Sequence, residues 1–294
     1  MTTHSQDAPY SEGRLYVGAT PIGNLSDITL RALEVLRSVD AIAAEDTRLT
    51  QQLLQRHGID KPLIAVHEHN EARAAEKLIE RIRCGERIAL VSDAGTPAVS
   101  DPGALLVRAV RAAGLRVEPL PGANAAIAAI SVAGLQSGRF LFYGFLPARA
   151  AERRKALEEL RAIAWPIVFY EAPHRILECA QDLTAVFGAE CSVFLARELT
   201  KVFETTLELT LAALPGWLEA DLNHQRGEFV LIVTPPPKPE GAEALAREHA
   251  LEILLAELPL KQAVQLAVRL TGGTRNELYE RALALKAGRE SDSS

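Results

Sequence analysis

Small-residue and polar loops follow several apolar runs of this sequence, and they hold its best candidates for chemistry. The apolar run at residues 88–91 is followed by a loop at 92–100 that carries the carboxylate of Asp93 among glycine, threonine and proline. Similar loops follow two other apolar runs, at 18–25 and 121–125. Because ligands bind outside the carboxyl ends of parallel strands, these loops predict the wall of a small-molecule site that holds a nucleoside.

Charged side chains come directly after other apolar runs. An unpaired buried charge is costly, so charged clusters at strand ends favour a site for proton transfer and anion binding. The alternative is a local ion-pair network, and for Asp46 and Arg48 also a simple helix cap. The charged candidates are Asp46, Arg48, Glu171, Glu198 and Lys201.

Several common cofactor sites are not indicated. The glycines after the first apolar run match neither a dinucleotide fingerprint nor a phosphate loop. His67 and His69 form a His-x-His pair without further ligand spacing, so no metal is expected. The cysteines are far apart and include no Cys-x-x-Cys pair, which fits a reduced cytoplasmic setting.

One basic cluster stands out in a chain whose net charge is −6 at pH 7. An acidic chain has no broad positive field for nucleic acid, but a local cluster is able to contact RNA phosphates. A solvated helix start is the alternative explanation. The cluster comprises Arg149, Arg153, Arg154 and Lys155.

Short apolar runs alternate with amphipathic segments between residues 14 and 120, which is typical of repeated βα units, and a second α/β series begins at residue 121. Runs buried on both faces predict a mostly parallel sheet covered by helices. Asp101 and Pro102 predict the start of a helix at 103–113, with the Asp101 side chain as its cap. The predicted strands are 15–19, 41–44, 63–66, 88–91, 117–120, 140–143, 167–171, 192–196, 203–209 and 229–233.

The chain divides into two α/β domains and a small helical domain. Consecutive prolines cannot continue a central strand, so they predict a linker. Beyond it, a glycine turn and the capping pair Thr274 and Glu277 resemble a helix-turn-helix, although a packing appendage is equally compatible. The expected parts are a flexible tail (1–13), an N-terminal α/β domain (14–121), a C-terminal α/β domain (122–234), a linker (235–240), a helical domain (241–288) and a tail (289–294).

Eight short motifs identify a family when they are taken together. They are TPIGNL (20–25), AEDTR (44–48), VSDAGTP (91–97), DPG (101–103), PLPG (119–122), GFLP (144–147), FYE (169–171) and ARELTK (196–201). In this order they resemble the tetrapyrrole methylase superfamily, and within it the bacterial enzymes that methylate a ribose 2′-hydroxyl of 16S ribosomal RNA. The target in that group is a decoding-centre cytidine.

The resemblance implies a class III methyltransferase that holds S-adenosylmethionine in the cleft between two α/β domains, usually as a homodimer. It also implies an RNA substrate in the small ribosomal subunit, which fits the cytoplasmic setting. The longest weakly polar run, 125–135, is about half the ~20 residues that a membrane helix requires, so no membrane segment is expected. A carboxylate among Asp46, Glu171 and Glu198 would take the proton, with Lys201 and Arg48 steadying negative charge. The implied cofactor contacts are Pro21, Gly23, Asp93, Gly95, Thr96, Asn124, Ala125 and Tyr170.

Two other functions remain open at this stage. The same fold and cofactor would serve methylation of a small tetrapyrrole, although neither the basic cluster nor the helical domain is needed for that. A non-catalytic protein that binds a nucleoside or the ribosome is the other alternative. Transfer of a labelled methyl group to a ribose, to a tetrapyrrole or to nothing separates these functions.

Overall fold

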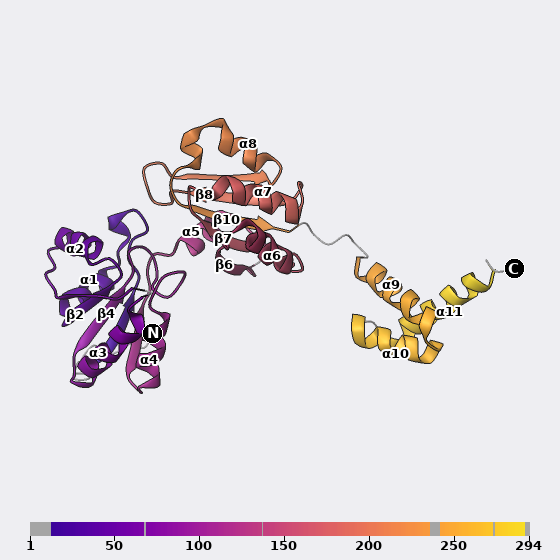
Figure 1. Cartoon of the computed structure of the whole chain (residues 1–294), viewed down its shortest axis with the longest axis horizontal. Helices are drawn as coiled ribbons and strands as arrows, with labels where there is room; N and C mark the ends of the chain where they lie inside the picture. The colour runs from indigo at the N-terminus through magenta and orange to yellow at the C-terminus, as the bar shows by residue number, and fades with distance from the viewer. Residues whose placement is uncertain (1–12, 68, 137, 236–241, 273, 292–294) are drawn as a thin grey trace, which may run out of the picture. The chain divides into compact units, whose positions relative to one another are not determined.

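The computed structural model describes residues 13–67, 69–136, 138–235, 242–272 and 274–291. Contacts divide the chain into two compact units, Met1–Pro236 and Pro237–Ser294, which are described one at a time. Within the described residues, the strands of the first unit form two sheets with helices packed on them (Figure 1). This confirms the predicted α/β fold class with a helical C-terminal part.

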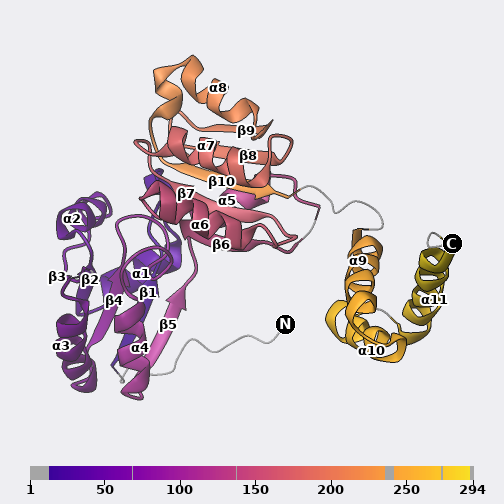
Figure 2. The ribbon, with the colours of Figure 1, turned by 45° about the vertical axis from the view of Figure 1, so that its right-hand side comes forward.

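The first sheet is parallel throughout its described strands. In β4 (Arg87–Val91), Ile88 and Leu90 pack in the apolar cluster with α3 (Glu71–Arg83) and α4 (Ala104–Ala112), and Ala89 and Val91 pack in the cluster with α1 (Leu30–Ser38) and α2 (Thr47–Arg56). Helices α3 and α4 lie side by side (Figures 1 and 2). Burial on both faces explains the unbroken apolar runs, and parallel pairing brings the carboxyl ends to one edge. The strand order is β3 (Leu63–Ala65), β2 (Ala41–Ala44), β4 (Arg87–Val91), β1 (Arg14–Gly18) and β5 (Arg116–Leu120).

The second sheet is mixed, because only β6 (Leu141–Phe145) and β7 (Ile167–Glu171) are parallel among its described neighbouring strands. One face packs against α5 (Ala125–Val132), and the other against α6 (Ala150–Leu160), α7 (Ile176–Phe187) and α8 (Ala213–Ala220). Antiparallel pairing places the end of β7, the start of β10 (Phe229–Thr234) and the end of β8 (Ser192–Arg197) at one edge. The strand order, visible in Figure 2, is β6 (Leu141–Phe145), β7 (Ile167–Glu171), β10 (Phe229–Thr234), β8 (Ser192–Arg197) and β9 (Thr205–Thr210).

Every predicted strand is present, and its ends lie within two residues of the predicted ones. Helix α8 was not predicted, because its sequence contains Pro215 and Gly216, which are unfavourable inside helices. Leu214 and Leu218 are nevertheless fully buried against the second sheet, so packing outweighs the local preference.

The start of α4 differs from the prediction. Gly103, not Asp101, is the N-cap residue, and its φ of 126° suits glycine. The cap comes from the buried Glu71 on α3, whose Oε1 accepts the N–H groups of Gly103 at 3.0 Å and Leu106 at 2.9 Å. A carboxylate at a helix N-terminus satisfies amides that lack partners inside the helix. Asp101 is therefore not engaged in capping α4.

The second unit contains α9 (Ala242–Glu257), α10 (Leu260–Thr271) and α11 (Arg275–Ser291) around a small apolar core. Gly272 ends α10 in the left-handed conformation. Thr274 Oγ1 accepts the N–H of Glu277 at 3.4 Å, as the predicted capping pair requires. None of the described helices combines the length and apolar character needed to cross a bilayer.

Glu71→Ala is expected to lower the free energy of unfolding by about 2 kcal/mol, because two amides at the start of α4 lose a buried acceptor. Glu71→Gln is the control, since it keeps one oxygen acceptor and is expected to lose clearly less. Urea unfolding followed by circular dichroism measures both values. Equal stability of Glu71→Ala and the unmodified protein would contradict the proposed cap.

Candidate active site

The loops that follow β1, β4 and β5 are joined by hydrogen bonds at the carboxyl edge of the first sheet. Thr20 and Gly95 form a backbone bridge, with N–H to O distances of 2.9 and 3.0 Å. Thr20 Oγ1 donates to the Ser92 carbonyl at 2.9 Å, and Thr96 Oγ1 donates to the Ala123 carbonyl at 3.1 Å. The three small-residue loops of the sequence thus form one wall.

The loop after β8 meets this wall from the second sheet. Asn24 N–H donates to Thr200 Oγ1 at 3.1 Å. A Cβ atom added to Gly23 would collide with the side chain of Lys201, so this approach requires glycine at position 23. The loops after β1 and β8 are therefore in direct contact, although they are far apart in the sequence.

Non-glycine residues in the left-handed conformation occur in the loop after β4 and in the loop after β8. In the loop after β4, φ is 66° at Ala98 and 62° at Ser100; in the loop after β8, φ is 53° at Glu198 and 67° at Thr200. Each such residue costs on the order of 1 kcal/mol, and this strain is concentrated at functional sites. Ser100 also approaches β6, where a Cβ atom on Gly144 would lie 2.7 Å from Ser100 Oγ.

A cleft of about 400 Å³ opens between the carboxyl-edge loops of the first sheet and the facing edge of the second. Backbone pairing sets Glu171, Phe229 and Arg197 side by side along that second edge. The cleft brings together many residues that the sequence proposed for cofactor binding and catalysis. Those that line it are Asp93, Gly95, Thr96, Asn124, Ala125, Tyr170, Glu171 and Lys201.

The other predicted residues lie outside the cleft lining. Two of them belong to the loop whose Ile22 lines the cleft, and one lies next to the lining residue Leu199. The residues outside are Pro21, Gly23, Asp46, Arg48, Glu198, Arg149, Arg153, Arg154 and Lys155.

Three lining carboxylates were missed by the sequence analysis: Glu45, Asp101 and Glu228. Glu45 comes directly after the apolar run 41–44 and precedes Asp46. Its position at the strand end was the signal that could have identified it. Asp101 was assigned to helix capping. Glu228 precedes β10, and its place at the cleft follows from antiparallel pairing, which brings the start of β10 to the edge. Strand direction was the missing information for Glu228.

The Asp46 side chain is paired with Arg48 and does not line the cleft. Arg48 donates from Nε to Oδ1 at 3.1 Å and from Nη2 to Oδ2 at 2.7 Å, and its N–H also donates to Oδ1 at 2.8 Å. These hydrogen bonds lower the pKa of Asp46 to about 2. Asp46 N–H in turn donates to Asp93 Oδ1 at 2.8 Å. The ion-pair and helix-cap alternative therefore describes Asp46 and Arg48.

Glu171 is also engaged by a cation. Its side chain is fully buried, and Arg175 Nη2 donates to Oε2 at 3.2 Å. The N–H of Ala172 donates to Oε1 at 2.8 Å. Burial and the charge of Glu171 together raise the pKa of the neighbouring Cys179 thiol well above its usual value. Both oxygens of this carboxylate are thus used for structure.

Lys201, which lines the cleft, is paired with two carboxylates. Its Nζ donates to Glu198 Oε1 and to Glu228 Oε2, each at 2.7 Å, and Glu228 N–H donates to Glu198 Oε1 at 3.1 Å. Burial opposes charge at both Glu198 and Lys201, but the hydrogen bonds between them prevail, lowering the pKa of Glu198 and raising that of Lys201. Lys201 is therefore a firmly protonated cation.

Asp101 and Glu45 differ from these carboxylates. Burial and the charges of Glu45, Asp93 and Glu228 raise the pKa of Asp101 to about 6. Burial and the charges of Asp93 and Asp46 raise the pKa of Glu45. Within the described residues, neither Asp101 nor Glu45 forms an ion pair. The cleft thus contains carboxylates that lack a neutralising cation.

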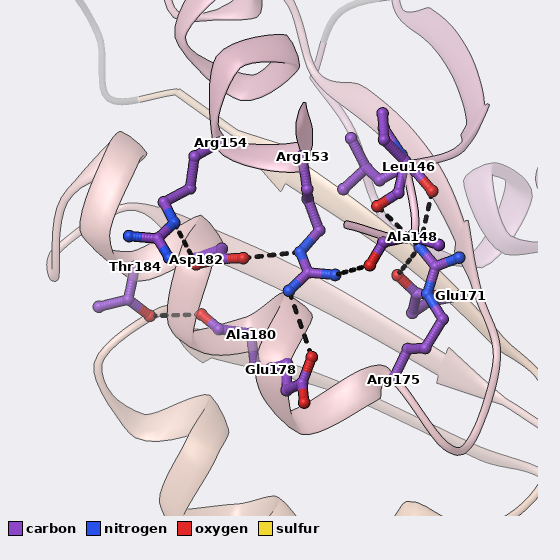
Figure 3. A network of polar contacts seen from close by, with 11 residues as sticks. Leu146, Ala148, Arg153, Arg154, Glu171, Arg175, Glu178, Ala180, Asp182 and Thr184 are labelled. Carbon is purple, nitrogen blue, oxygen red and sulfur yellow. Dashed lines mark hydrogen bonds and ion pairs between the residues drawn. The ribbon is translucent and has the colours of Figure 1, made fainter. Parts of the chain in front are cut away.

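The prediction that Arg153 contacts RNA is wrong. Its side chain is 1% exposed, and its guanidinium donates to Asp182 Oδ2 at 2.6 Å, to the Ala148 carbonyl at 3.2 Å and to Glu178 Oε2 at 3.5 Å (Figure 3). Arg153 therefore ties α6 to α7. Arg154 pairs with Asp182 at 3.1 Å but stays 58% exposed. Arg149 and Lys155 are exposed as well.

The sequence of residues 14–215 matches the family profile described as Tetrapyrrole (Corrin/Porphyrin) Methylases. In fold, the chain is similar to uroporphyrin-III C-methyl transferase from Thermus thermophilus, whose crystal structure is a complex with S-adenyl homocysteine. The TM-score is 0.53 at 15% identity, over 75% of this chain and 96% of that chain. Fold and profile define a methyltransferase built from two α/β sheets.

Residues 241–286 match a second profile, described as RsmI C-terminal HTH domain. Ribosomal RNA small subunit methyltransferase I of Pseudomonas aeruginosa is 53% identical over 275 residues, which are 93% of this chain and 98% of that protein. The protein of that name from Escherichia coli O157:H7 is 50% identical over 278 residues, 95% of this chain and 97% of that protein. The chain belongs to the tetrapyrrole methylase family, in the group that these relatives form.

Arg153→Ala is expected to lower the free energy of unfolding by about 3 kcal/mol, because it leaves the buried Asp182 with a weaker partner. Arg149→Ala is the matched control from the same cluster, and its exposed ion pair with Glu152 predicts almost no change. Urea unfolding measures both variants. A stable Arg153→Ala variant that had lost affinity for RNA would restore the original prediction.

Proposed function

We propose that this chain transfers a methyl group from S-adenosylmethionine to the ribose 2′-hydroxyl of a decoding-centre cytidine in 16S ribosomal RNA, within the small ribosomal subunit. The observation that carries this proposal is 53% identity, over 93% of the chain, to a relative named for that subunit. The methylase profile ends at residue 215, and the separate C-terminal profile begins at 241. An added helical part favours a large RNA substrate over a small tetrapyrrole.

The charge of the cleft fits S-adenosylmethionine, which carries a sulfonium and an ammonium group. Glu45, Asp93, Asp101 and Glu228 line the cleft with Lys201, so negative charge is in excess there. Opposite charge attracts most strongly where water is partly excluded. The proposed contacts with this methyl donor are Pro21, Gly23, Asp93, Gly95, Thr96, Asn124, Ala125 and Tyr170, of which Pro21 and Gly23 act by shaping their loop.

When bound, S-adenosylmethionine supplies an electrophilic methyl group. The task left to the protein is to hold the ribose oxygen in line and to remove its proton. Lys201 is placed to steady negative charge on that oxygen, since it lines the cleft and stays protonated. Glu198 positions Lys201, Asp46 positions Asp93 through its N–H, and Glu171 fixes the end of β7 through Arg175.

The proposed RNA contacts are exposed basic side chains around the first and second sheets. Arg48 keeps 87% of its side chain exposed despite its pairing with Asp46, and Arg149, Arg154 and Lys155 are exposed on α6. The chain is acidic as a whole, with a net charge of −6, so recognition depends on the shape of the folded subunit and on a few phosphate contacts. Such a substrate places the reaction in the cytoplasm, and we propose that the chain acts as a homodimer.

Incubation with labelled S-adenosylmethionine and small ribosomal subunits from a strain that lacks this activity is expected to label a ribose 2′-oxygen of one cytidine. Nuclease digestion and mass spectrometry locate the label. Uroporphyrinogen and free cytidine serve as control acceptors and are expected to stay unlabelled. Label on the tetrapyrrole, or on no acceptor, would contradict the proposed function.

Asp93→Ala is expected to weaken S-adenosylmethionine binding about tenfold to hundredfold, because a hydrogen bond to a charged group contributes about 1.5–3 kcal/mol. Calorimetric titration measures the Kd, and thermal unfolding verifies that the variant is folded. Asp60→Ala is the matched control, because Asp60 is exposed and lies outside the cleft lining. An unchanged Kd for Asp93→Ala would remove Asp93 from the cofactor site.

A further inference from the structure

We infer that the Phe145 ring is the platform on which the base of the target nucleotide stacks while its ribose is methylated. This inference rests on the proposed function, which assigns no residue to the base. Phe145 lines the cleft but remains 50% exposed. Aromatic rings that stand open in a nucleic-acid cleft hold single bases, since every base has a planar face that stacks on them.

A β-bulge in β6 directs the Phe145 ring toward the cleft. The pairing of β6 with β7 shifts by one residue between Phe142 and Gly144. Because side chains alternate between the two faces of a strand, Phe142 and Phe145 would lie on opposite faces without this shift. With it, both rings contact Tyr170 on β7, at centroid distances of 5.1 and 5.5 Å. Bulges of this kind re-aim side chains beside active sites.

The contact between Phe145 and Tyr170 leaves room for a planar ligand. The two rings meet edge to face, with an angle of 66° between their planes. Such a contact involves at most one face of the Phe145 ring, which agrees with the half of the residue that stays exposed. The Tyr170 ring is itself fixed, because its Oη accepts the N–H of Ala126 in α5 at 3.1 Å. A base is therefore able to approach the other face of a ring that is already in place.

Two largely buried arginines hold the segment that follows Phe145. Arg175 Nη2 donates to the Leu146 carbonyl at 2.6 Å (Figure 3). Arg153 Nη1 donates to the Ala148 carbonyl at 3.2 Å. The side chains of these arginines are 17% and 1% exposed, respectively. The ring is thus carried by a backbone that is fixed before any ligand binds, which lowers the entropy cost of stacking.

The position of Phe145 favours the base of the RNA over the adenine of the methyl donor. β6 is an outer strand of the second sheet, and Arg149, whose side chain is 84% exposed, lies four residues beyond Phe145. Four residues span at most about 14 Å, so a base on Phe145 brings its flanking phosphates close to this arginine. The contacts proposed for the methyl donor lie instead on loops of the first sheet, on α5 and on β7.

A stacking platform offsets a cost that the substrate imposes. A nucleotide in folded RNA is stacked on its neighbours, and many enzymes reach their target by turning the nucleotide out of the stack. The Phe145 ring replaces the lost stacking and holds the nucleotide with its ribose in the cleft. Because stacking tolerates every base, Phe145 sets the position of the nucleotide and not the choice of cytidine.

Phe145→Leu tests the inference. It keeps an apolar side chain but removes the planar ring, so kcat/KM for small ribosomal subunits is expected to fall about tenfold to hundredfold. The calorimetric Kd for S-adenosylmethionine is expected to change by less than about twofold, because the donor contacts lie elsewhere. Phe145→Trp and Phe145→Tyr keep a planar ring, and at least one of them is expected to stay within about threefold of the kcat/KM of the unmodified protein.

Tyr143→Leu is the matched control from the same strand. Tyr143 is also an exposed aromatic residue, but it contacts Phe169 on the other face of the sheet and lies outside the cleft lining. Its replacement is expected to leave kcat/KM for the subunit unchanged. Thermal unfolding verifies that each variant is folded.

Cross-linking provides a readout that does not depend on turnover. Protein with p-benzoylphenylalanine at position 145 is irradiated with small ribosomal subunits and S-adenosylhomocysteine. The cross-link is expected at the nucleotide that the unmodified protein methylates, and primer extension locates it. The same group at position 143 is expected to give no cross-link to that nucleotide.

Four results would overturn the inference. The first is an equal kcat/KM for Phe145→Leu and the unmodified protein. The second is a loss that neither Phe145→Trp nor Phe145→Tyr recovers, which would make the role of Phe145 structural. The third is a Kd for S-adenosylmethionine that rises as much as kcat/KM falls, which would place the ring against the adenine of the donor. The fourth is a cross-link from position 145 to another part of the RNA. If Phe145→Leu does not fold, the cross-link decides.

Failure of the proposed function has a different signature. In that case the unmodified protein binds S-adenosylmethionine but transfers no methyl group to the small ribosomal subunit. If the unmodified protein methylates a ribose and Phe145→Leu does so equally fast, the proposed function stands and only the role of Phe145 is lost.

Discussion

The hydrogen bonds between the Glu71 carboxylate and the first amides of α4 are the constraint on which the arrangement of the cleft depends. A helix needs acceptors for its first free N–H groups, and these often come from the side chain of its own N-cap residue. Here α3 supplies the acceptor, from a residue buried between the two helices. The polar residues of the loop after β4 therefore do not have to cap α4, and they face the cleft.

The carboxylates of this region fall into two groups, those that are paired with a cation and those that are not. Arg48 and Arg175 each fix one carboxylate, Lys201 fixes two, and these ion pairs shape the loops around the cleft. Glu45 and Asp101 lie in the same region without such partners. In a chain with so many acidic residues, chemical function is therefore decided less by which acids are present than by which of them an arginine or lysine has already neutralised.

The sequence predicted the strands well and singled out the small-residue loops that line the cleft, because both depend on local patterns. Apolar runs buried on both faces leave little choice of structure, and glycine-rich loops at their ends are visible without knowledge of the fold. Arg153 and Asp101 could not be predicted in this way. Their roles depend on Asp182 and Glu71, which come from other helices, and Glu228 reaches the cleft only through the antiparallel direction of β10.

The contact between Gly23 and Lys201 couples the residue types that are possible at one position in each of the two α/β parts. A side chain at position 23 would occupy the volume that Lys201 fills, so the first position is free to vary only if the second becomes smaller or moves. Two sites far apart in the chain are thus expected to change together during evolution. A homologue with alanine or serine at position 23 should carry a shorter side chain at 201. A cation from another position should then neutralise the carboxylates of its cleft.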